Sequence, residues 1–176
     1  VMDYLKGKMI RLRALDPDDT DFMSRVEADA CNFEYSGLTA PYSSRQLLEY
    51  AVCYDADPFR ATQLRLVIED ITDSNPVGLL DFTEISARER TAFTGIYILP
   101  AWRRRGLALD SLLTARRYAA DILALRYLGA KISVANDSSL ALFRKAGWIQ
   151  YGVMPEWIYS PALRLYVDLH LLACRL

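Results

Sequence analysis

The sequence predicts one α/β domain with a mixed, mostly antiparallel sheet, and three observations support this class. Its 176 residues suit a single domain, so we treat 1–176 as one unit. A hydrophobic fraction of 52% with a charged fraction of 24% is typical of a globular protein with a sizeable core. Antiparallel strand patterns come first along the chain and a crossover helix comes later, which is the order of a mixed sheet.

Strands are predicted where apolar residues alternate with polar ones or form short runs bounded by turn residues. Residues 9–15 alternate between apolar and basic side chains. Only a short polar segment separates 77–86 from 91–99, so these two strands should form an antiparallel hairpin. About seven strands are expected in all. They are 9–15, 63–70, 77–86, 91–99, 130–135, 148–157 and 163–173.

About four helices are expected, and residues that commonly cap helices mark where they begin. Asp16 followed by Pro17 is a normal N-cap and first-turn pair. Ser43 or Ser44 is a suitable cap for a second helix. The predicted helices are 16–29, 43–54, 106–125 and 137–147, while 31–42 is expected to be irregular.

The helix predicted at 106–125 has two stripes of opposite character, which indicates that it packs on the sheet. One stripe is expected to face the core. Its members are Ala108, Leu112, Ala115, Ala119 and Ile122. The other is expected to face solvent. Its members are Asp110, Thr114, Arg117 and Asp121.

The charge balance and the cysteines limit the classes of function. A net charge of -1 at pH 7 gives no support to general binding of nucleic acids or membrane surfaces. The three cysteines are far apart, which is typical of reduced thiols rather than of a disulfide framework or a zinc site. The single histidine, His170, lies among leucines, so neither a histidine-based triad nor a metal site is expected. Without a signal-peptide pattern or a long apolar run, we expect a cytoplasmic protein with no membrane span.

Three consecutive arginines, Arg103, Arg104 and Arg105, stand just before Gly106 at the start of the long helix. Cations are unfavourable at this end of a helix by a few tenths to about 1 kcal/mol each. The unpaired backbone N–H groups there bind anions, and a glycine lets a ligand approach the backbone. The spacing from Arg103 through Gly106 to Ala108 therefore predicts a site for a diphosphate. A solvated, arginine-rich loop is the alternative.

A second motif, NDSSLALFRKAGW, begins at Asn136. Together, the arginine motif and this one resemble those of the GNAT family of acyl-CoA N-acyltransferases. The segments GKMIRLRALDPDDTDFM, PVGLLDFTEI and YGVMPEWIY also resemble its branch of ribosomal-protein N-terminal and spermidine acetyltransferases. The resemblance spans nearly the whole chain. It implies a GNAT fold, in which the strands before and after the long helix splay apart.

The resemblance also implies acetyl-CoA as the co-substrate and gives residues to its parts. The segment from Arg103 to Ala108 would wrap the diphosphate, and the strand before it would pair with the pantetheine arm through its backbone. Asn136 would hold this arm or order a water, while Ser139 and Phe143 would face the acyl end. The expected cofactor-binding residues are Ile98, Leu99, Arg103, Arg104, Arg105, Gly106, Leu107, Ala108, Asn136 and Phe143.

Acyl transfer to an amine needs a neutral amine, a polarised thioester carbonyl and a leaving group. A backbone N–H on 95–99 can polarise the carbonyl. A primary aliphatic amine with a pKa near 10.4 is only about 0.04% neutral at pH 7, so it needs a base. The base candidates are Glu84, Glu156 and Asp81.

Phe143 departs from the pattern of the family, because many relatives have a tyrosine there that protonates the departing thiolate. Ser139 or a water is expected to assist instead, since a thiol with a pKa near 8.5 leaves with little help. Tyr97 and Tyr159 are further candidates. A non-catalytic acyl-CoA-binding domain is the alternative that Phe143 raises.

The acceptor is less determined by the sequence. A peptide or protein N-terminal amine is slightly favoured over a polyamine. Glu27, Asp29 and Glu34, with the aromatic residues of 31–42, either line a cleft for a cationic amine or form an exposed acidic helix end. A nucleic-acid-binding module that uses the arginines at 103–105, 116 and 117 is a further alternative, against which the near-neutral net charge argues. A monomer or a homodimer is expected.

Overall fold

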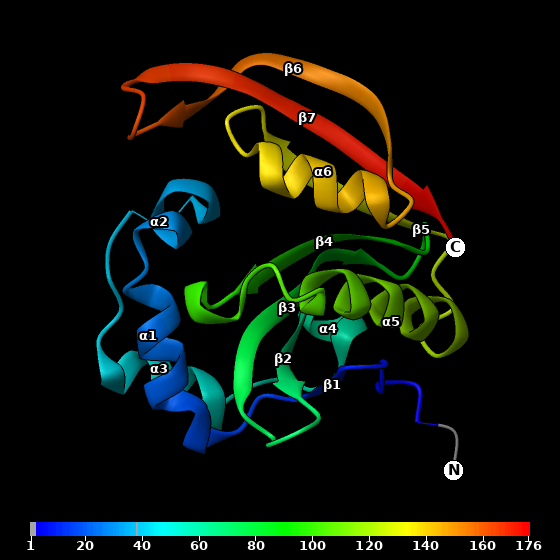
Figure 1. The fold of residues 1–176 in the computed structure, drawn as a ribbon. Coiled ribbons are helices and arrows are strands. Elements are labelled where there is room, and N and C mark those ends of the chain that lie inside the picture. Colours follow the sequence, from blue (N-terminus) through cyan, green and yellow to red (C-terminus); the bar gives the residue numbers. More distant parts are fainter. Residues whose placement is uncertain (1–2, 38) are drawn as a thin grey trace.

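Seven strands form one sheet in the order β1-β2-β3-β4-β5-β7-β6 (Figure 1). The computed structural model describes residues 3–37 and 39–176. Neighbouring strands are antiparallel except β4 and β5, which run parallel. The predicted mixed, mostly antiparallel sheet is therefore confirmed. The strands are β1 (Ile10–Ala14), β2 (Leu64–Asp70), β3 (Pro76–Ser86), β4 (Thr91–Ile98), β5 (Tyr127–Ser133), β6 (Ile149–Ser160) and β7 (Leu165–Arg175).

Six α-helices accompany the sheet in the described residues, where the sequence predicts about four. The first unexpected one, α2, lies in a segment expected to be irregular. The second, α4, begins with Asp57 and Pro58, the same cap pair as Asp16 and Pro17, and the Asp57 carboxylate accepts the N–H of Phe59. The helices are α1 (Thr20–Glu27), α2 (Ala30–Ser36), α3 (Ser44–Val52), α4 (Pro58–Ala61), α5 (Leu107–Asp121) and α6 (Asp137–Lys145).

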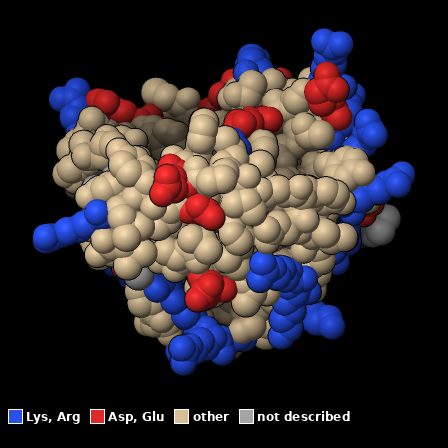
Figure 2. Space-filling view, turned by 90° about the horizontal axis from the view of Figure 1, so that it is seen from above, with Lys and Arg blue, Asp and Glu red and all other residues tan. Residues whose placement is uncertain are grey.

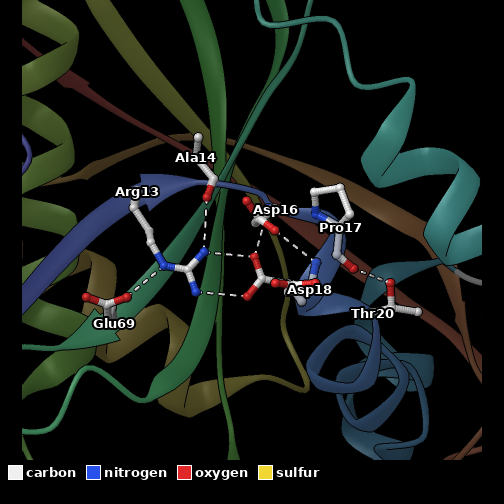
Figure 3. A network of polar contacts seen from close by, with 8 residues as sticks. Arg13, Ala14, Asp16, Pro17, Asp18, Thr20 and Glu69 are labelled. Atoms are coloured by element: carbon white, nitrogen blue, oxygen red, sulfur yellow. Dashed lines mark hydrogen bonds and ion pairs between the residues drawn. The ribbon is translucent and has the colours of Figure 1, made fainter.

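A polar network fastens the first turn of the helical region to the edge of the sheet (Figure 3). Asp16 is an N-cap, as the sequence predicts, but it caps the 3₁₀ turn Pro17–Asp19, with which it forms a capping box through Asp19. Arg13 of β1 donates to both oxygens of Asp19 at 2.8 Å and to Glu69 of β2 at 2.7 Å. The hydrogen bond to Asp19 is the main reason that the pKa of Arg13 is raised. This network fixes the position at which the chain leaves β1 and enters α1.

The two faces of the sheet carry separate apolar cores because alternate residues of each strand point to opposite sides. On β3, Leu80 packs with α5 and α6, whereas its neighbour Leu79 packs with α1 and α3. On β2, Ile68 and Val67 divide in the same way. Figure 1 shows β6 and β7 rising over α6 at the top of the view. The sheet thus separates a face under α5 and α6 from a face under α1 and α3.

The long helix α5 differs from its prediction in length and in its buried face. It ends at Asp121 rather than near residue 125, because Ala124 has a positive φ of 51° that turns the chain back into the core. Asp110, expected to face solvent, is buried, and its Oδ2 accepts the N–H of Met9 at 2.7 Å. Thr114 is buried as well, while Ile122, expected in the core, is 47% exposed. The N-terminal segment covers the polar stripe at Asp110 and Thr114, which the helical pattern alone does not reveal, while Arg117 and Asp121 are exposed as expected.

Candidate active site

The parallel strands β4 and β5 pair over a short stretch and then separate. Pairing joins residues 91–93 of β4 to residues 127–129 of β5, and no further pair forms between them in the described residues. Thr94, the next residue of β4, is 5% exposed, and its Oγ1 finds no hydrogen-bond partner in the part of the chain that the structure describes. A polar ligand inserted between the strands would satisfy this hydroxyl. The splayed central strands are therefore present.

The start of α5 follows the open end of β4 and has no side-chain cap. Gly106 is its N-cap with a φ of 84°, a conformation that favours glycine. The N–H groups of the first turn, including those of Leu107 and Ala108, have no acceptor within the helix. They stand at the positive end of the helix dipole. This arrangement fits the phosphate group that the sequence predicts here.

Arg103 braces the fold rather than pointing to an open anion site. Its Nε donates to the carbonyl of Ile98 at 2.8 Å, and its Nη2 donates to Asp29 at 2.9 Å. The N–H of Leu99 donates to the carbonyl of Val77. The Ile98 carbonyl and the Leu99 N–H therefore already have partners inside the chain, and the roles of Ile98, Leu99 and Arg103 toward a co-substrate stay predictions.

Arg104 and Arg105 are exposed beside the start of α5. Arg104 has a positive φ of 62°. Arg105 lies 4.7 Å from the ring centroid of Trp102 and donates to the carbonyl of Ala101 at 3.0 Å. Such a stacked guanidinium keeps donors at its edge for a ligand. Arg104 and Arg105 thus remain the arginines predicted to contact phosphate.

The downstream motif places Asn136 at the N-cap of α6. Its Oδ1 accepts the N–H of Ser139 at 3.1 Å and the hydroxyl of Ser138 at 3.0 Å. Phe143, one turn further along α6, is 2% exposed and packs edge-to-face on Trp148 with ring centroids 5.1 Å apart. The first structural task of the motif is therefore to cap and anchor α6. The roles of Asn136, Ser139 and Phe143 toward a co-substrate stay predictions.

The two leading base candidates lie in different strands and share an unusual backbone. Glu84 and Glu156 each occupy a bulge with a positive φ, 50° and 47°. Glu84 forms an ion pair with Lys131 of β5 at 2.5 Å. The N–H of Glu156 donates to Asp168 of β7 at 2.9 Å. Strained backbone is common at functional sites, but the structure does not bring these two carboxylates together.

Polar residues gather on the α1 and α3 face, beside the open part of β4. Gly95 of β4 lies opposite Asp81 of β3, and a Cβ placed on Gly95 would meet no atom within 4 Å. Asp81 receives two hydrogen bonds from Arg65 of β2, at 2.8 and 2.9 Å. This open space adjoins a strongly polar wall. We name that wall the Arg65 cluster, and its members are Glu27, Tyr50, Tyr54, Arg65 and Asp81.

The members of the Arg65 cluster come from four separate segments. The guanidinium of Arg65 lies 5.6 Å from the ring centroid of Tyr50, and the hydroxyl of Tyr54 accepts its backbone N–H. Burial raises the pKa of Tyr50 to about 12 and, with Asp81, raises that of Glu27, while Arg65 opposes both shifts. Arg65, Tyr50 and Tyr54 were not expected from the sequence, because no local motif links them.

Two other acidic residues of the predicted cleft are already bonded. The carboxylate of Asp29 accepts the Tyr97 hydroxyl at 2.6 Å as well as the guanidinium described above. Burial and this hydrogen bond raise the pKa of Tyr97. Glu34 accepts the hydroxyl of Ser160 and the N–H of Ala162. These contacts hold the corner of α1 and α2 to β4 and to the loop after β6.

The outer side of β6 and β7 is apolar and carries few charges. Figure 2 views this side from above, with most lysines and arginines around its edge. Within the described ranges, 3–37 and 39–176, no helix is long and apolar enough to span a membrane. No group of three potential metal-ligating side chains was found there either. The exposed large apolar residues of β6 and β7 are Ile149, Tyr151, Val153, Trp157, Tyr159, Leu165 and Tyr166.

Comparison with known proteins identifies relatives of this site and fold. The model of the acetyltransferase (GNAT) domain matches residues 10–149. The spermidine N(1)-acetyltransferase of Escherichia coli K12 is 26% identical over 92% of this chain and 87% of its own length. The Vibrio cholerae spermidine N(1)-acetyltransferase is 26% identical over 92% of this chain and 94% of its own length. A crystal structure of the Vibrio cholerae spermidine N-acetyltransferase in complex with CoA and spermine superposes with a TM-score of 0.83. It is 25% identical, over 96% of both chains.

Proposed function

Since the chain belongs to the GNAT acetyltransferase family, we propose that its acceptor is a polyamine, an amine that carries at least one further ammonium group. The protein is an acetyl-CoA-dependent N-acetyltransferase. The Escherichia coli and Vibrio cholerae relatives are spermidine acetyltransferases, which favours the polyamine over the N-terminal amine that the sequence slightly favoured. The observation that carries the proposal is the open space at Gly95 beside the carboxylates of the Arg65 cluster.

The donor end of the site supports acetyl-CoA binding by its own residues. The uncapped first turn of α5 offers backbone N–H groups to a diphosphate, and Arg104 and Arg105 flank it. The unpaired Thr94 hydroxyl lies where β4 leaves β5. The thioester supplies the activated acetyl group. A backbone N–H of β4 beside Gly95 is suited to polarise its carbonyl.

The reaction must remove two protons from the acceptor nitrogen, because an ammonium group becomes an amide N–H. A primary ammonium group must first lose a proton to a carboxylate, directly or through water, because its pKa near 10.4 keeps it charged at pH 7. The neutral nitrogen forms the new C–N bond, and the C–S bond breaks as the CoA thiolate departs. The nitrogen loses its second proton to a base or to that thiolate. Its ordinary pKa near 8.5 makes this departure possible without the tyrosine that Phe143 replaces.

The experiment that tests the donor half reverses two charges at the start of α5. In the double variant Arg104→Glu and Arg105→Glu, we expect acetyl-CoA affinity measured by calorimetry to fall about a hundredfold or more, since two charge-assisted contacts become repulsive. Arg45→Glu with Arg88→Glu is the matched control, because both arginines are exposed on other elements. Equal affinity in the two double variants would remove the basis for the site.

The alternative of a nucleic-acid-binding module loses support from the arginines that suggested it. Arg103 and Arg105 bond to their own chain, as described above. Arg116 donates to the carbonyl of Ala146 and Arg117 to that of Lys6. These side chains do not form one open basic surface.

The assembly and location of the protein stay predictions. A related Vibrio cholerae enzyme has been solved as a dodecamer, whereas the sequence leads us to expect a monomer or a homodimer here. Size-exclusion chromatography with light scattering distinguishes these states. The cytoplasmic location that we propose is supported by the scattered cysteines, of which Cys53 and Cys174 are free thiols.

A further inference from the structure

One carboxylate oxygen in the Arg65 cluster is buried without a donor. Glu27 is the last residue of α1, and its Oε2 has no hydrogen-bond partner among the residues that the structure describes. The nearby positive charge of Arg65 is directed elsewhere, because its Nε and Nη2 both donate to Asp81. Asp81 itself repels a charge on Glu27. The cluster therefore holds two carboxylates against one guanidinium.

Such an arrangement is unfavourable for the isolated protein. A buried polar group without a partner costs about 1–3 kcal/mol, and more when it is charged. Burial raises the pKa of Glu27, the direction expected for a carboxylate that loses water. A neutral glutamine of the same shape would avoid the charge. A carboxylate at this position is explained if a cationic ligand supplies the missing donor.

Among the acidic residues of this face, Glu27 is the one whose bonding capacity remains open. Asp29 accepts from Tyr97 and Arg103, and both oxygens of Glu34 accept hydrogen bonds. The Arg65 cluster also adjoins the open space over Gly95, since Asp81 lies opposite Gly95 in the sheet. A cation in this space lies next to the cluster that holds the unsatisfied oxygen of Glu27.

We propose that the Glu27 carboxylate accepts a hydrogen bond from a non-reacting ammonium group of the acceptor and thereby selects acceptors with more than one positive charge. This inference rests on the proposed polyamine acceptor and names the side chain that recognises it. The ammonium donates the hydrogen bond that Oε2 lacks, and its positive charge offsets the net negative charge of the cluster. The reacting nitrogen lies elsewhere on the same molecule, so Glu27 acts on binding rather than on the chemical step.

The test compares wild type with Glu27→Gln on two acceptors, spermidine and hexylamine, which has a single ammonium group. We expect the KM for spermidine to rise about ten- to hundredfold, since a charge-assisted hydrogen bond is lost. The KM for hexylamine and both kcat values should change less than about twofold. Glu49→Gln is the matched control, because it removes an exposed carboxylate paired only with Arg45.

Calorimetric binding of spermidine in the presence of CoA gives a second measure that needs no turnover. Weaker binding in Glu27→Gln, with wild-type binding in Glu49→Gln, supports the proposal. Equal spermidine binding in all three proteins, or no binding to wild type, overturns it. If wild type binds spermidine but acetylates no amine, the proposed function is wrong. The binding data for Glu27→Gln still decide the role of Glu27 in that case.

Unfolding in urea separates this role from a structural one. The raised pKa of Glu27 favours the folded state at low pH, and this contribution is lost as the pH rises through that pKa. Glu27→Gln should therefore be at least as stable as wild type, with an advantage that is larger at pH 7 than at pH 4. A loss of stability at pH 7 together with equal losses for both acceptors would show that Glu27 only supports the fold.

Discussion

The two sides of the candidate site are built in different ways. The donor side is one continuous segment, in which the end of β4, the arginines and the first turn of α5 follow each other between residues 98 and 108. The acceptor side, the Arg65 cluster, draws on α1, the region of α3, β2 and β3. The donor side offers backbone N–H groups, whereas the acceptor side offers carboxylates held by one guanidinium.

This difference follows from what each side must bind. A diphosphate is the same in every reaction of this co-substrate, so a local motif with backbone donors can serve it. An acceptor varies, and side chains from separate elements can change one at a time. Acetyl-CoA binding at the donor side should therefore be sensitive to changes in backbone conformation. Acceptor binding should be sensitive to the change of a single charged side chain.

The largest effect that sharpens this comparison is expected at Asp81. Asp81→Asn leaves Arg65 half-paired in a site where both side chains are about one quarter exposed. We expect the free energy of unfolding to fall by about 2–3 kcal/mol, since breaking a largely buried pair leaves one charge without its partner. Urea denaturation measures the fall, and the kcat/KM for spermidine should decrease with it.

Asp55→Asn is the matched control for that change. It breaks the ion pair with Arg60, which lies outside the site; the Arg60 hydrogen bond is the main reason that the pKa of Asp55 is lowered to about 2. Exposed ion pairs contribute little, so stability and activity should stay near those of wild type. A similar loss of stability and activity in both variants would mean that the Arg65–Asp81 pair contributes no more than an exposed ion pair.

Two glycines allow a smaller and more selective test of the two sides. Gly106→Ala forces an L-residue to a φ of 84° with its Cβ 3.1 Å from Met9, so unfolding free energy should fall by about 1–2 kcal/mol and acetyl-CoA affinity should weaken. Gly95→Ala places a Cβ in open space, so stability should be kept while acceptor kcat/KM falls. On both variants, calorimetry measures acetyl-CoA affinity, urea unfolding measures stability, and steady-state kinetics measures the acceptor kcat/KM. A normal acceptor kcat/KM in Gly95→Ala would show that the acceptor does not pass over β4.

The same contrast explains what the sequence predicted. The sheet, the caps at Asp16 and Ser43, and the start of the long helix at Gly106 follow local rules of periodicity and capping. The Arg65 cluster was missed because Arg65 and Tyr50 meet only after the sheet and α3 pack together. The contact between Arg103 and Asp29 was also not expected, because the two residues are far apart in the sequence.

The smallest effect is expected at Phe143, where the resemblance predicts a tyrosine acid. Phe143→Tyr adds a hydroxyl in a buried position beside Trp148, so stability should fall by about 1 kcal/mol if the new group finds no partner. A CoA thiolate leaves readily on its own, so kcat at pH 7 should rise only about threefold if the hydroxyl reaches it. Steady-state kinetics at pH 6 to 9 measures the gain in kcat. The gain should be largest at low pH, where the thiolate departs less readily without an acid. A gain of a hundredfold or more would instead show that the natural chain lacks an effective acid. The acceptor side would then be a binding surface served by slow chemistry.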